Sequence, residues 1–270
     1  MSGGESDMPT VQLLPVWQGK FHAKVHIAGS GPAVVFLHGI WGLTWNSFLD
    51  RLAERYTVYA IEHPGTNTDE PNAVHDLAGI HDLVLFYNEV LDGLKLPAPI
   101  VIGHSFGGMV AAELAATNPE RVGRLVLIAP LGLWREDMPV TNWATVNPKK
   151  LSEVLFKDPK GVAAQRMFTP PSDPMEAAQA RGRFLWSQAC ADKFVWPIPD
   201  KGLKNRIHRV KAQTLLLWGE DDRLVPTVYA QEFAKRISGA QVAMVKEAGH
   251  HVQEEQPEDA AERIFSFLKS

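Results

Sequence analysis

The segment Ile100-Val-Ile-Gly-His-Ser105-Phe-Gly-Gly108 decides the fold, because it places a serine between two glycines where one hydrophobic pattern gives way to another. The apolar residues 100–102 are typical of a short buried strand, and the alanine-rich residues 106–117 are typical of a helix. In this strand–turn–helix context, the G-x-S-x-G pattern predicts a nucleophilic serine at a tight turn. The glycines leave room for neighbouring backbone, and the start of a helix stabilises developing negative charge. We therefore expect Ser105 to be a nucleophile.

Short apolar runs with the same character recur along the chain. They lie at residues 33–37, 57–61, 100–102, 124–128 and 214–218. Such continuous runs are typical of a parallel sheet that is buried on both faces. Helical patterns separate or follow them, at residues 46–55, 80–94, 106–117 and 257–268. The alternation predicts an α/β fold with a doubly wound, mostly parallel sheet.

The alternation stops between residues 131 and 209. This stretch is rich in proline, contains no clear strand pattern, and holds four of the eight tryptophans. Disordered segments are poor in aromatic residues, so a linker is disfavoured. We expect residues 131–209 to form a mainly helical cap on a core made of residues 11–130 and 210–270. Residues 1–10 are rich in Gly, Ser and acidic side chains, and we expect them to be disordered.

Charge and hydrophobicity disfavour some classes of binding partner. The net charge is −4, and no basic stripe indicates nucleic acid or an anionic membrane surface. No apolar run is long enough to span a bilayer, and the N-terminus lacks the pattern of a signal peptide. Cys190 is the only cysteine, which fits a reducing compartment. We expect a cytoplasmic protein with no nucleic-acid or membrane partner; nothing in the sequence indicates its oligomeric state.

A nucleophilic serine needs a base, and the base needs an acid that orients it. Among ten histidines, His250 and His251 lie in a turn between an apolar run at residues 241–245 and the last helical pattern. Such a turn can lie at the carboxyl edge of the sheet, where sites form in these folds. The acid comes between nucleophile and base in chain order, and residues 218–226 offer Glu220, Asp221 and Asp222.

The reaction also needs two backbone N–H donors for an oxyanion. The amide of Phe106, directly after the serine, is one candidate. The second is the amide of Ile40, in the turn His38-Gly-Ile-Trp-Gly42 after the first apolar run.

Four ordered motifs give the chain a specific resemblance. They are HGIWG at residues 38–42, GHSFGG at 103–108, WGEDDRLVP at 218–226 and AGHH at 248–251. From about residue 20 onward the chain resembles the α/β-hydrolase superfamily, in the capped branch of serine hydrolases. The resemblance assigns the acid to Asp222 and the base to His250, with Asp221 and His251 as second choices.

The resemblance also ranks the possible reactions. Haloalkane dehalogenases and epoxide hydrolases use an aspartate nucleophile, so Ser105 disfavours both. C–C bond hydrolases usually carry a Gly-rich, Asn-containing stretch after the first His-Gly and Asn-Ser at the elbow. This chain instead has Ile40-Trp-Gly-Leu-Thr-Trp-Asn46 and His104-Ser105. We therefore expect a carboxylesterase that cleaves an apolar small-molecule ester through an acyl-enzyme, with no metal or organic cofactor.

Three other functions stay open. A C–C bond hydrolase of ring-cleavage keto acids would need a cation for the substrate carboxylate, and Arg135, Arg166, Arg181 and Arg183 are the candidates. A cofactor-free perhydrolase would use the same triad with peroxide, and a ligand receptor could keep the triad on this fold. Apolar pockets suit such substrates, and our candidates for the lining are Trp41, His38, His104, Trp134, Trp143 and Trp186.

Overall fold

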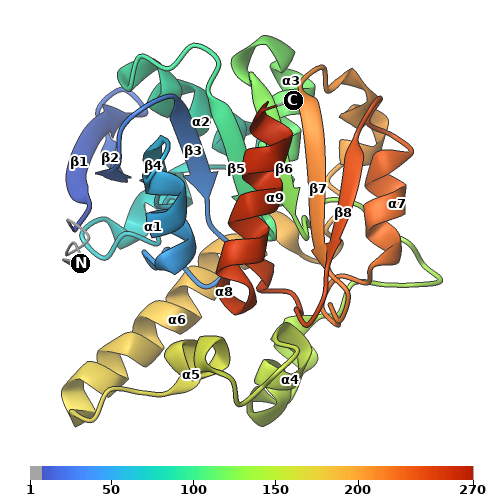
Figure 1. Cartoon of the computed structure of the whole chain (residues 1–270). Helices are drawn as coiled ribbons and strands as arrows, with labels where there is room; N and C mark the ends of the chain where they lie inside the picture. Colours follow the sequence, from blue (N-terminus) through green and yellow to red (C-terminus); the bar gives the residue numbers. More distant parts are fainter. Residues whose placement is uncertain (1–7, 270) are drawn as a thin grey trace, which may run out of the picture.

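The computed structural model describes residues 8–269, and eight strands form its central sheet (Figure 1). The strands are β1 (Thr10–Val16), β2 (Phe21–Ala28), β3 (Ala33–Leu37), β4 (Thr57–Ile61), β5 (Ile100–His104), β6 (Arg124–Ile128), β7 (Gln213–Gly219) and β8 (Gln241–Val245). Their order is β1-β2-β4-β3-β5-β6-β7-β8. The pairs from β4 through β8 are parallel, whereas β1 and β2 join the sheet antiparallel. The predicted mostly parallel sheet is confirmed.

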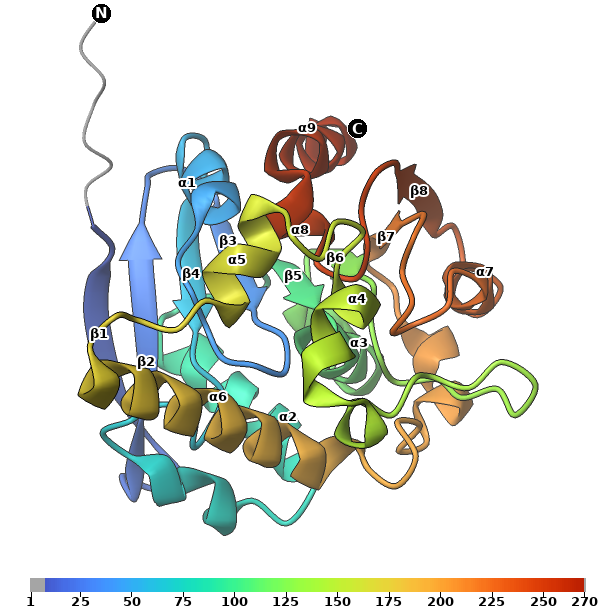
Figure 2. The same ribbon diagram turned by 90° about the horizontal axis from the view of Figure 1, so that it is seen from below.

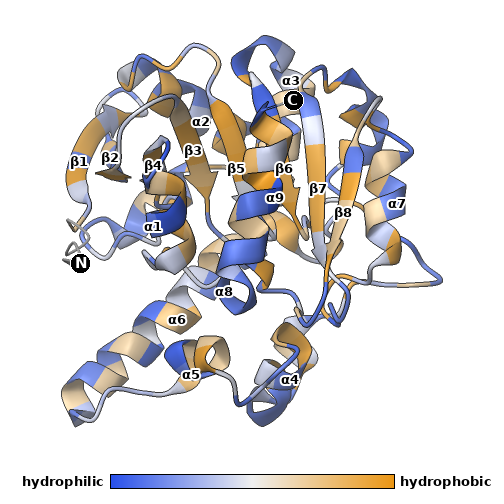
Figure 3. Cartoon of the chain, viewed as in Figure 1, coloured by the Kyte–Doolittle hydropathy of each residue, from blue (hydrophilic) through white to orange (hydrophobic). Residues whose placement is uncertain are grey.

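Helices cover both faces of this sheet. One face packs against α1 (Ser47–Ala53), the short α8 (Val252–Glu255) and α9 (Pro257–Lys269). The other packs against α2 (Ile80–Gly93), α3 (Phe106–Thr117) and α7 (Val228–Ala234). Alternate side chains of one strand enter the two layers, as Val34 and Val35 of β3 do. The strands therefore carry continuous apolar runs, which Figure 3 shows as hydrophobic colour along the centre of the sheet.

The antiparallel edge of the sheet was absent from the prediction. In β2, the buried residues Phe21, Ala23 and Val25 alternate with more exposed histidine and lysine residues. This alternation is the pattern of a strand with one solvated face, not of a doubly buried strand. The predicted disordered segment 1–10 also needs correction, because Thr10 already pairs with Ile27 in β1. Residues 1–7 lie outside the described residues.

Residues 131–209 form the segment between β6 and β7, and they contain no strand. Their helices are α4 (Leu151–Leu155), α5 (Val162–Phe168) and α6 (Pro174–Val195), with short 3-10 turns before α4 and after α6. Figures 1 and 2 show α4, α5 and α6 grouped at one end of the sheet. The backbone N–H of His250 donates to Leu155 O (2.8 Å), which holds the end of α4 over the loop that follows β8.

A buried ion pair fastens this segment to the core. The guanidinium of Arg206 donates to both carboxylate oxygens of Glu113 in α3, at 2.6 and 2.7 Å. Burial raises the pKa of Glu113, and the bonds from Arg206 act in the opposite direction. Because desolvation is the larger influence, the pair fixes the position of the segment at a cost in solvation.

Breaking this pair from one side should destabilise the protein strongly. We expect Arg206→Met to lower the free energy of unfolding by about 3–5 kcal/mol, because it leaves the Glu113 carboxylate buried and unpaired. The double variant Glu113→Gln/Arg206→Met should lose less than Arg206→Met alone. Urea denaturation of the two variants and the wild type measures both quantities. A double variant that is less stable than Arg206→Met would contradict this account of the pair.

Candidate active site

Three buried side chains form a continuous hydrogen-bonded chain at the carboxyl end of the sheet. Ser105 Oγ lies 2.8 Å from His250 Nε2, and His250 Nδ1 lies 2.9 Å from Asp222 Oδ2. Asp222 Oδ1 accepts two further bonds, from the backbone N–H groups of Leu224 and Val225, both at 2.9 Å. The carboxylate can only accept, so Nδ1 carries the proton and Nε2 is left to accept from the serine hydroxyl.

Ser105 lies at a strained turn between β5 and α3. Its φ and ψ are 55° and −113°, a conformation that residues other than glycine rarely adopt. Its backbone N–H donates to Ile128 O (2.9 Å), and its carbonyl accepts from Met109 N and Leu131 N. A Cβ at Gly103 would meet Gly107 O at 2.4 Å, so the turn requires glycine there.

The turn after β3 lies directly against the nucleophile. A Cβ added at Gly39 would lie 3.6 Å from Ser105 Cβ and 2.9 Å from His104 Nδ1. The predicted oxyanion donors are the amides of Ile40, in this turn, and of Phe106, the first residue of α3. Within residues 8–269, neither amide has a hydrogen-bond partner. Both N–H groups can therefore donate a hydrogen bond to an oxyanion at Ser105.

A buried network that the sequence analysis did not identify supports this turn. His63 donates from Nε2 to His38 O (2.8 Å), and the His63 backbone N–H donates to His38 Nε2 (3.0 Å). The hydroxyl of Tyr87 bonds to His63 Nδ1, and His38 Nδ1 donates to Gly39 O at 2.7 Å. Burial lowers the pKa of His38 and lowers that of His63 to about 4, so both rings stay neutral at pH 7. In the sequence, the segment Glu62-His-Pro-Gly65, placed one strand beyond the turn, was the available signal for His63.

The second choices for acid and base have other partners. Asp221 accepts from Lys157 Nζ at 2.9 Å, and it does not contact His250. His251 Nδ1 lies 3.0 Å from Glu254 Oε1, and its ring stacks on Phe156. The geometry therefore brings together Ser105, His250 and Asp222.

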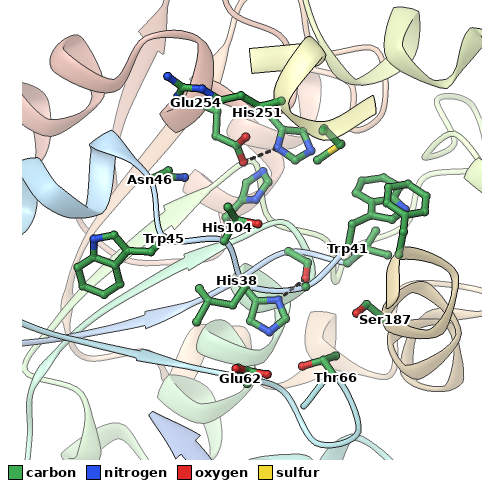
Figure 4. Close-up of a pocket in the computed structure, with 18 of the residues that line it drawn as sticks. His38, Trp41, Trp45, Asn46, Glu62, Thr66, His104, Ser187, His251 and Glu254 are labelled. Atoms are coloured by element: carbon green, nitrogen blue, oxygen red, sulfur yellow. Dashed lines mark hydrogen bonds and ion pairs between the residues drawn. The ribbon is translucent and has the colours of Figure 1, made fainter. Parts of the chain in front are cut away.

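A cavity of about 660 Å³ lies beside the Gly39 turn (Figure 4). His38, Trp41 and His104, three of the predicted lining residues, form part of its wall. The His104 side chain points away from the serine, and its Nε2 donates to His250 O at 3.0 Å. Ser105 and His250 do not line the cavity, and both are buried. Gly39 and Ile40 line this space and Gly39 also lies against Ser105, so their turn borders both the cavity and the nucleophile.

Three of the predicted lining residues do not border this cavity, so that prediction is wrong for it. Trp143 is buried between Trp41 and Trp196 and donates to Asp192 Oδ1. Trp186 donates to Gly65 O. Trp134 donates to Glu136. These three indoles connect the helical segment to itself and to the core. The aromatic residue of α6 that lines the cavity is Phe184.

The four candidate arginines have different surroundings. Arg166 and Arg183 line the cavity at its exposed rim, on α5 and α6. Neither has an ion-pair or hydrogen-bond partner in the described part of the chain. Arg135 pairs with Asp137 and Glu232, and Arg181 is exposed and lies outside the cavity. Two cations therefore face the cavity without a protein anion of their own.

The described residues carry no group of three or more His, Cys, Asp or Glu side chains arranged to hold a metal ion. Among their helices, none combines the length and the apolar character needed to cross a bilayer.

Comparisons with known proteins agree with this geometry. The family model described as "Alpha/beta hydrolase family" matches residues 34–263. A 2-hydroxy-6-oxo-6-phenylhexa-2,4-dienoate hydrolase of Burkholderia cepacia is 26% identical over 275 residues, 93% of this chain and 93% of the relative. The dihydrolipoyllysine-residue acetyltransferase component of the acetoin cleaving system of Cupriavidus necator is 30% identical over 247 residues. That match covers 86% of this chain, whereas the chain spans only 62% of the relative. The solved structure of the naproxen esterase of Bacillus subtilis has a TM-score of 0.73 at 20% identity, covering 96% of this chain and 91% of that one.

The buried His63 should make stability depend on pH. Its pKa is about 4 in the folded chain and near 6.5 when exposed. Between these values the unfolded chain binds a proton that the folded chain does not, so stability is lost as the pH falls from 6.5 to 4. The contribution of this one group is about 3 kcal/mol.

We expect His63→Gln to reduce the dependence of the unfolding free energy on pH between 7 and 4.5, measured by urea denaturation, while the buried His38 and His104 keep part of it. His208→Gln, at an exposed histidine, is the control and should keep the wild-type slope. A slope that is unchanged in His63→Gln would show that His63 is not the group that titrates.

Proposed function

Because the chain belongs to the alpha/beta hydrolase family, we propose that it is a serine hydrolase that cleaves a carboxylic ester through an acyl-Ser105 intermediate. The observation that carries the proposal is the unbroken line from Ser105 Oγ through His250 to Asp222, with bonds of 2.8 and 2.9 Å. All three residues are buried, in surroundings where hydrogen bonds to charged groups are strong.

Each group in this line has one chemical role. His250 Nε2 takes the proton of Ser105 Oγ while the oxygen attacks the ester carbonyl. Asp222 holds the Nδ1 proton and stabilises the imidazolium that forms. The amides of Ile40 and Phe106 donate to the oxyanion. His250 then protonates the leaving alcohol, and it next activates the water that releases the acyl group from Ser105.

The helical segment 131–209 acts as a cap in this proposal. Its α5 and α6 contribute Arg166, Met167, Arg183, Phe184 and Ser187 to the wall of the cavity, which the turn that carries Ile40 also borders. A cap that is built from one continuous insertion sets the shape of the substrate site without altering the triad.

The first test is hydrolysis of p-nitrophenyl acetate, butanoate, hexanoate and octanoate by wild type and Ser105→Ala. We expect wild-type turnover and a loss of roughly 10⁴–10⁶-fold in kcat for the variant, because the nucleophile is absent. The chain length with the highest kcat/KM measures the depth of the acyl site. Equal rates for the two proteins, with the fold of both verified by circular dichroism, would refute ester cleavage at Ser105.

A second candidate function is hydrolysis of a C–C bond in a 2-hydroxy-6-oxo-dienoate. The observation in its favour is the pair of unpartnered cations, Arg166 and Arg183, on a cavity beside the oxyanion turn. The B. cepacia relative, similar over nearly its whole length, is named for such a substrate. Like an ester, this substrate presents a carbonyl to the triad, and it also carries a carboxylate that a guanidinium can bind through two hydrogen bonds.

This candidate predicts turnover of 2-hydroxy-6-oxo-6-phenylhexa-2,4-dienoate, followed by loss of its conjugated absorbance. Arg183→Ala should raise KM by about 3- to 10-fold with little change in kcat, because an exposed cation contributes modestly to binding. Arg181→Ala is the matched control, since Arg181 is an exposed arginine of the same helix that does not line the cavity. No turnover, or equal effects of the two substitutions, would exclude this role of Arg183.

A further inference from the structure

The peptide group between Gly39 and Ile40 contains one of the two predicted oxyanion donors, and a side chain holds the carbonyl of the same group. His38 Nδ1 donates to Gly39 O at 2.7 Å, a bond that Figure 4 draws as a dashed line from His38. In the part of the chain that the structure describes, no other donor bonds to Gly39 O. The His38 imidazole is therefore the hydrogen-bond anchor of this carbonyl.

Peptide geometry couples this bond to the oxyanion donor. The Gly39–Ile40 peptide is trans, and in a trans peptide the C=O and the N–H lie in one plane and point in opposite directions. Holding Gly39 O toward the His38 ring therefore directs the Ile40 N–H away from that ring. A Cβ added at Gly39 would lie 3.6 Å from Ser105 Cβ, so this peptide is next to the nucleophile. A rotation of the peptide plane would remove the donor that an oxyanion at Ser105 needs.

The residue at position 39 makes such a rotation easy unless another group opposes it. A Cβ there would lie 2.9 Å from His104 Nδ1, and the His104 ring is held by its bond to His250 O, so the close approach favours glycine. Glycine has more backbone freedom than any other residue, so a peptide group beside it can turn over at low cost. The bond from His38 opposes this rotation, and the turn keeps both the close approach and a single orientation.

The position of the proton on His38 follows from the partners of two imidazole rings. The backbone N–H of His63 donates to His38 Nε2, so Nε2 is an acceptor and Nδ1 carries the proton of the neutral ring. His63 Nε2 donates to His38 O, and the Tyr87 hydroxyl donates to the remaining nitrogen of His63. Burial lowers the pKa of both rings, which keeps each of them neutral. The donor to Gly39 O is thus fixed by the bonds around it.

We infer that His38 is a positioning residue, whose Nδ1–H orients the Gly39–Ile40 peptide so that the Ile40 N–H is available to the oxyanion. The inference rests on the proposed function, because it concerns the oxyanion site of the same reaction. The carbonyl oxygen of the substrate gains its negative charge only as Ser105 attacks, so the effect of His38 belongs to the transition state. Loss of the orienting bond should therefore lower kcat more than it changes KM.

Two substitutions of nearly equal shape separate the hydrogen bond from the volume of the side chain. His38→Asn places an amide N–H where the Nδ1–H stood, whereas His38→Leu has no donor. With p-nitrophenyl butanoate we expect His38→Leu to lower kcat by about 10- to 100-fold, part of the roughly 10²–10³-fold that a whole oxyanion donor contributes. KM should change by less than about 3-fold. His38→Asn should recover most of the lost kcat, with all rates expressed per folded protein as measured by circular dichroism.

Inhibition by butaneboronic acid measures the oxyanion site without turnover. Ser105 Oγ adds to boron and its proton passes to His250, which leaves a tetrahedral anion that keeps both boron hydroxyl groups and resembles the transition state. We expect His38→Leu to weaken the inhibitor by about the factor by which it lowers kcat/KM, because both depend on the same donor. His38→Asn should bind the inhibitor nearly as tightly as wild type does. A general loosening of the fold would not weaken the boronate while sparing KM.

Crystal structures of the two variants examine the peptide directly. We expect the Gly39 carbonyl of His38→Leu to be turned over or present in two orientations, and that of His38→Asn to keep the wild-type orientation. An unchanged carbonyl in His38→Leu, a wild-type kcat in this variant, or equal losses of kcat in both variants would overturn the inference. A wild-type protein that neither cleaves the esters nor binds the boronate would instead contradict the proposed function, because the orientation of the peptide is measured without either reaction.

Discussion

The strained backbone at Ser105 is the constraint on which the rest of the site depends. A left-handed φ of 55° in a serine is unfavourable, and it persists because three backbone hydrogen bonds fix the residue between β5, β6 and α3. The neighbouring chain can approach only where side chains are missing. A Cβ at Gly107 would lie 2.1 Å from Leu37 O, so glycine at this position lets the end of β3 pass beneath the elbow. The same close approach places the Gly39 turn, and with it the Ile40 amide, beside Ser105.

Histidine serves two different purposes in this region, and the partner of each ring separates them. His38, His63 and His104 bond to backbone carbonyls, and burial lowers the pKa of all three. Such rings stay neutral and act as fixed links between loops. His250 and His251 instead place Nδ1 against a carboxylate, which fixes the position of the proton on Nδ1. For His250 this arrangement leaves the Nε2 lone pair to accept from Ser105 Oγ.

The sequence was informative wherever function depends on local spacing and chain order. The glycines around Ser105 predicted the elbow, and the continuous apolar runs predicted the parallel part of the sheet, which the structure confirms. Strand β2, which lies next to the edge strand β1, was missed because its polar face alternates with its buried one. The Glu113–Arg206 pair joins residues 93 positions apart, which no local pattern can indicate. The contact between His251 and Glu254 had a usable signal, since the two residues are three positions apart at the start of a helix.

Tryptophan was a poor guide to the cavity, and the reason is the chemistry of the side chain. An indole has a polar N–H as well as an apolar ring, and the buried Trp143 and the more exposed Trp186 lie where an acceptor is available, at Asp192 and at Gly65 O. These bonds fix the helical segment to itself and to the core. The buried residues of α6 all lie between Ser187 and Val195, whereas Ala180, Arg183 and Phe184, which line the cavity, come from its less buried half. Few buried contacts mean low local stability. The part of α6 that lines the cavity is therefore also the part that costs least to displace, while Trp143, Trp186 and Arg206 fix the segment to itself and to the core.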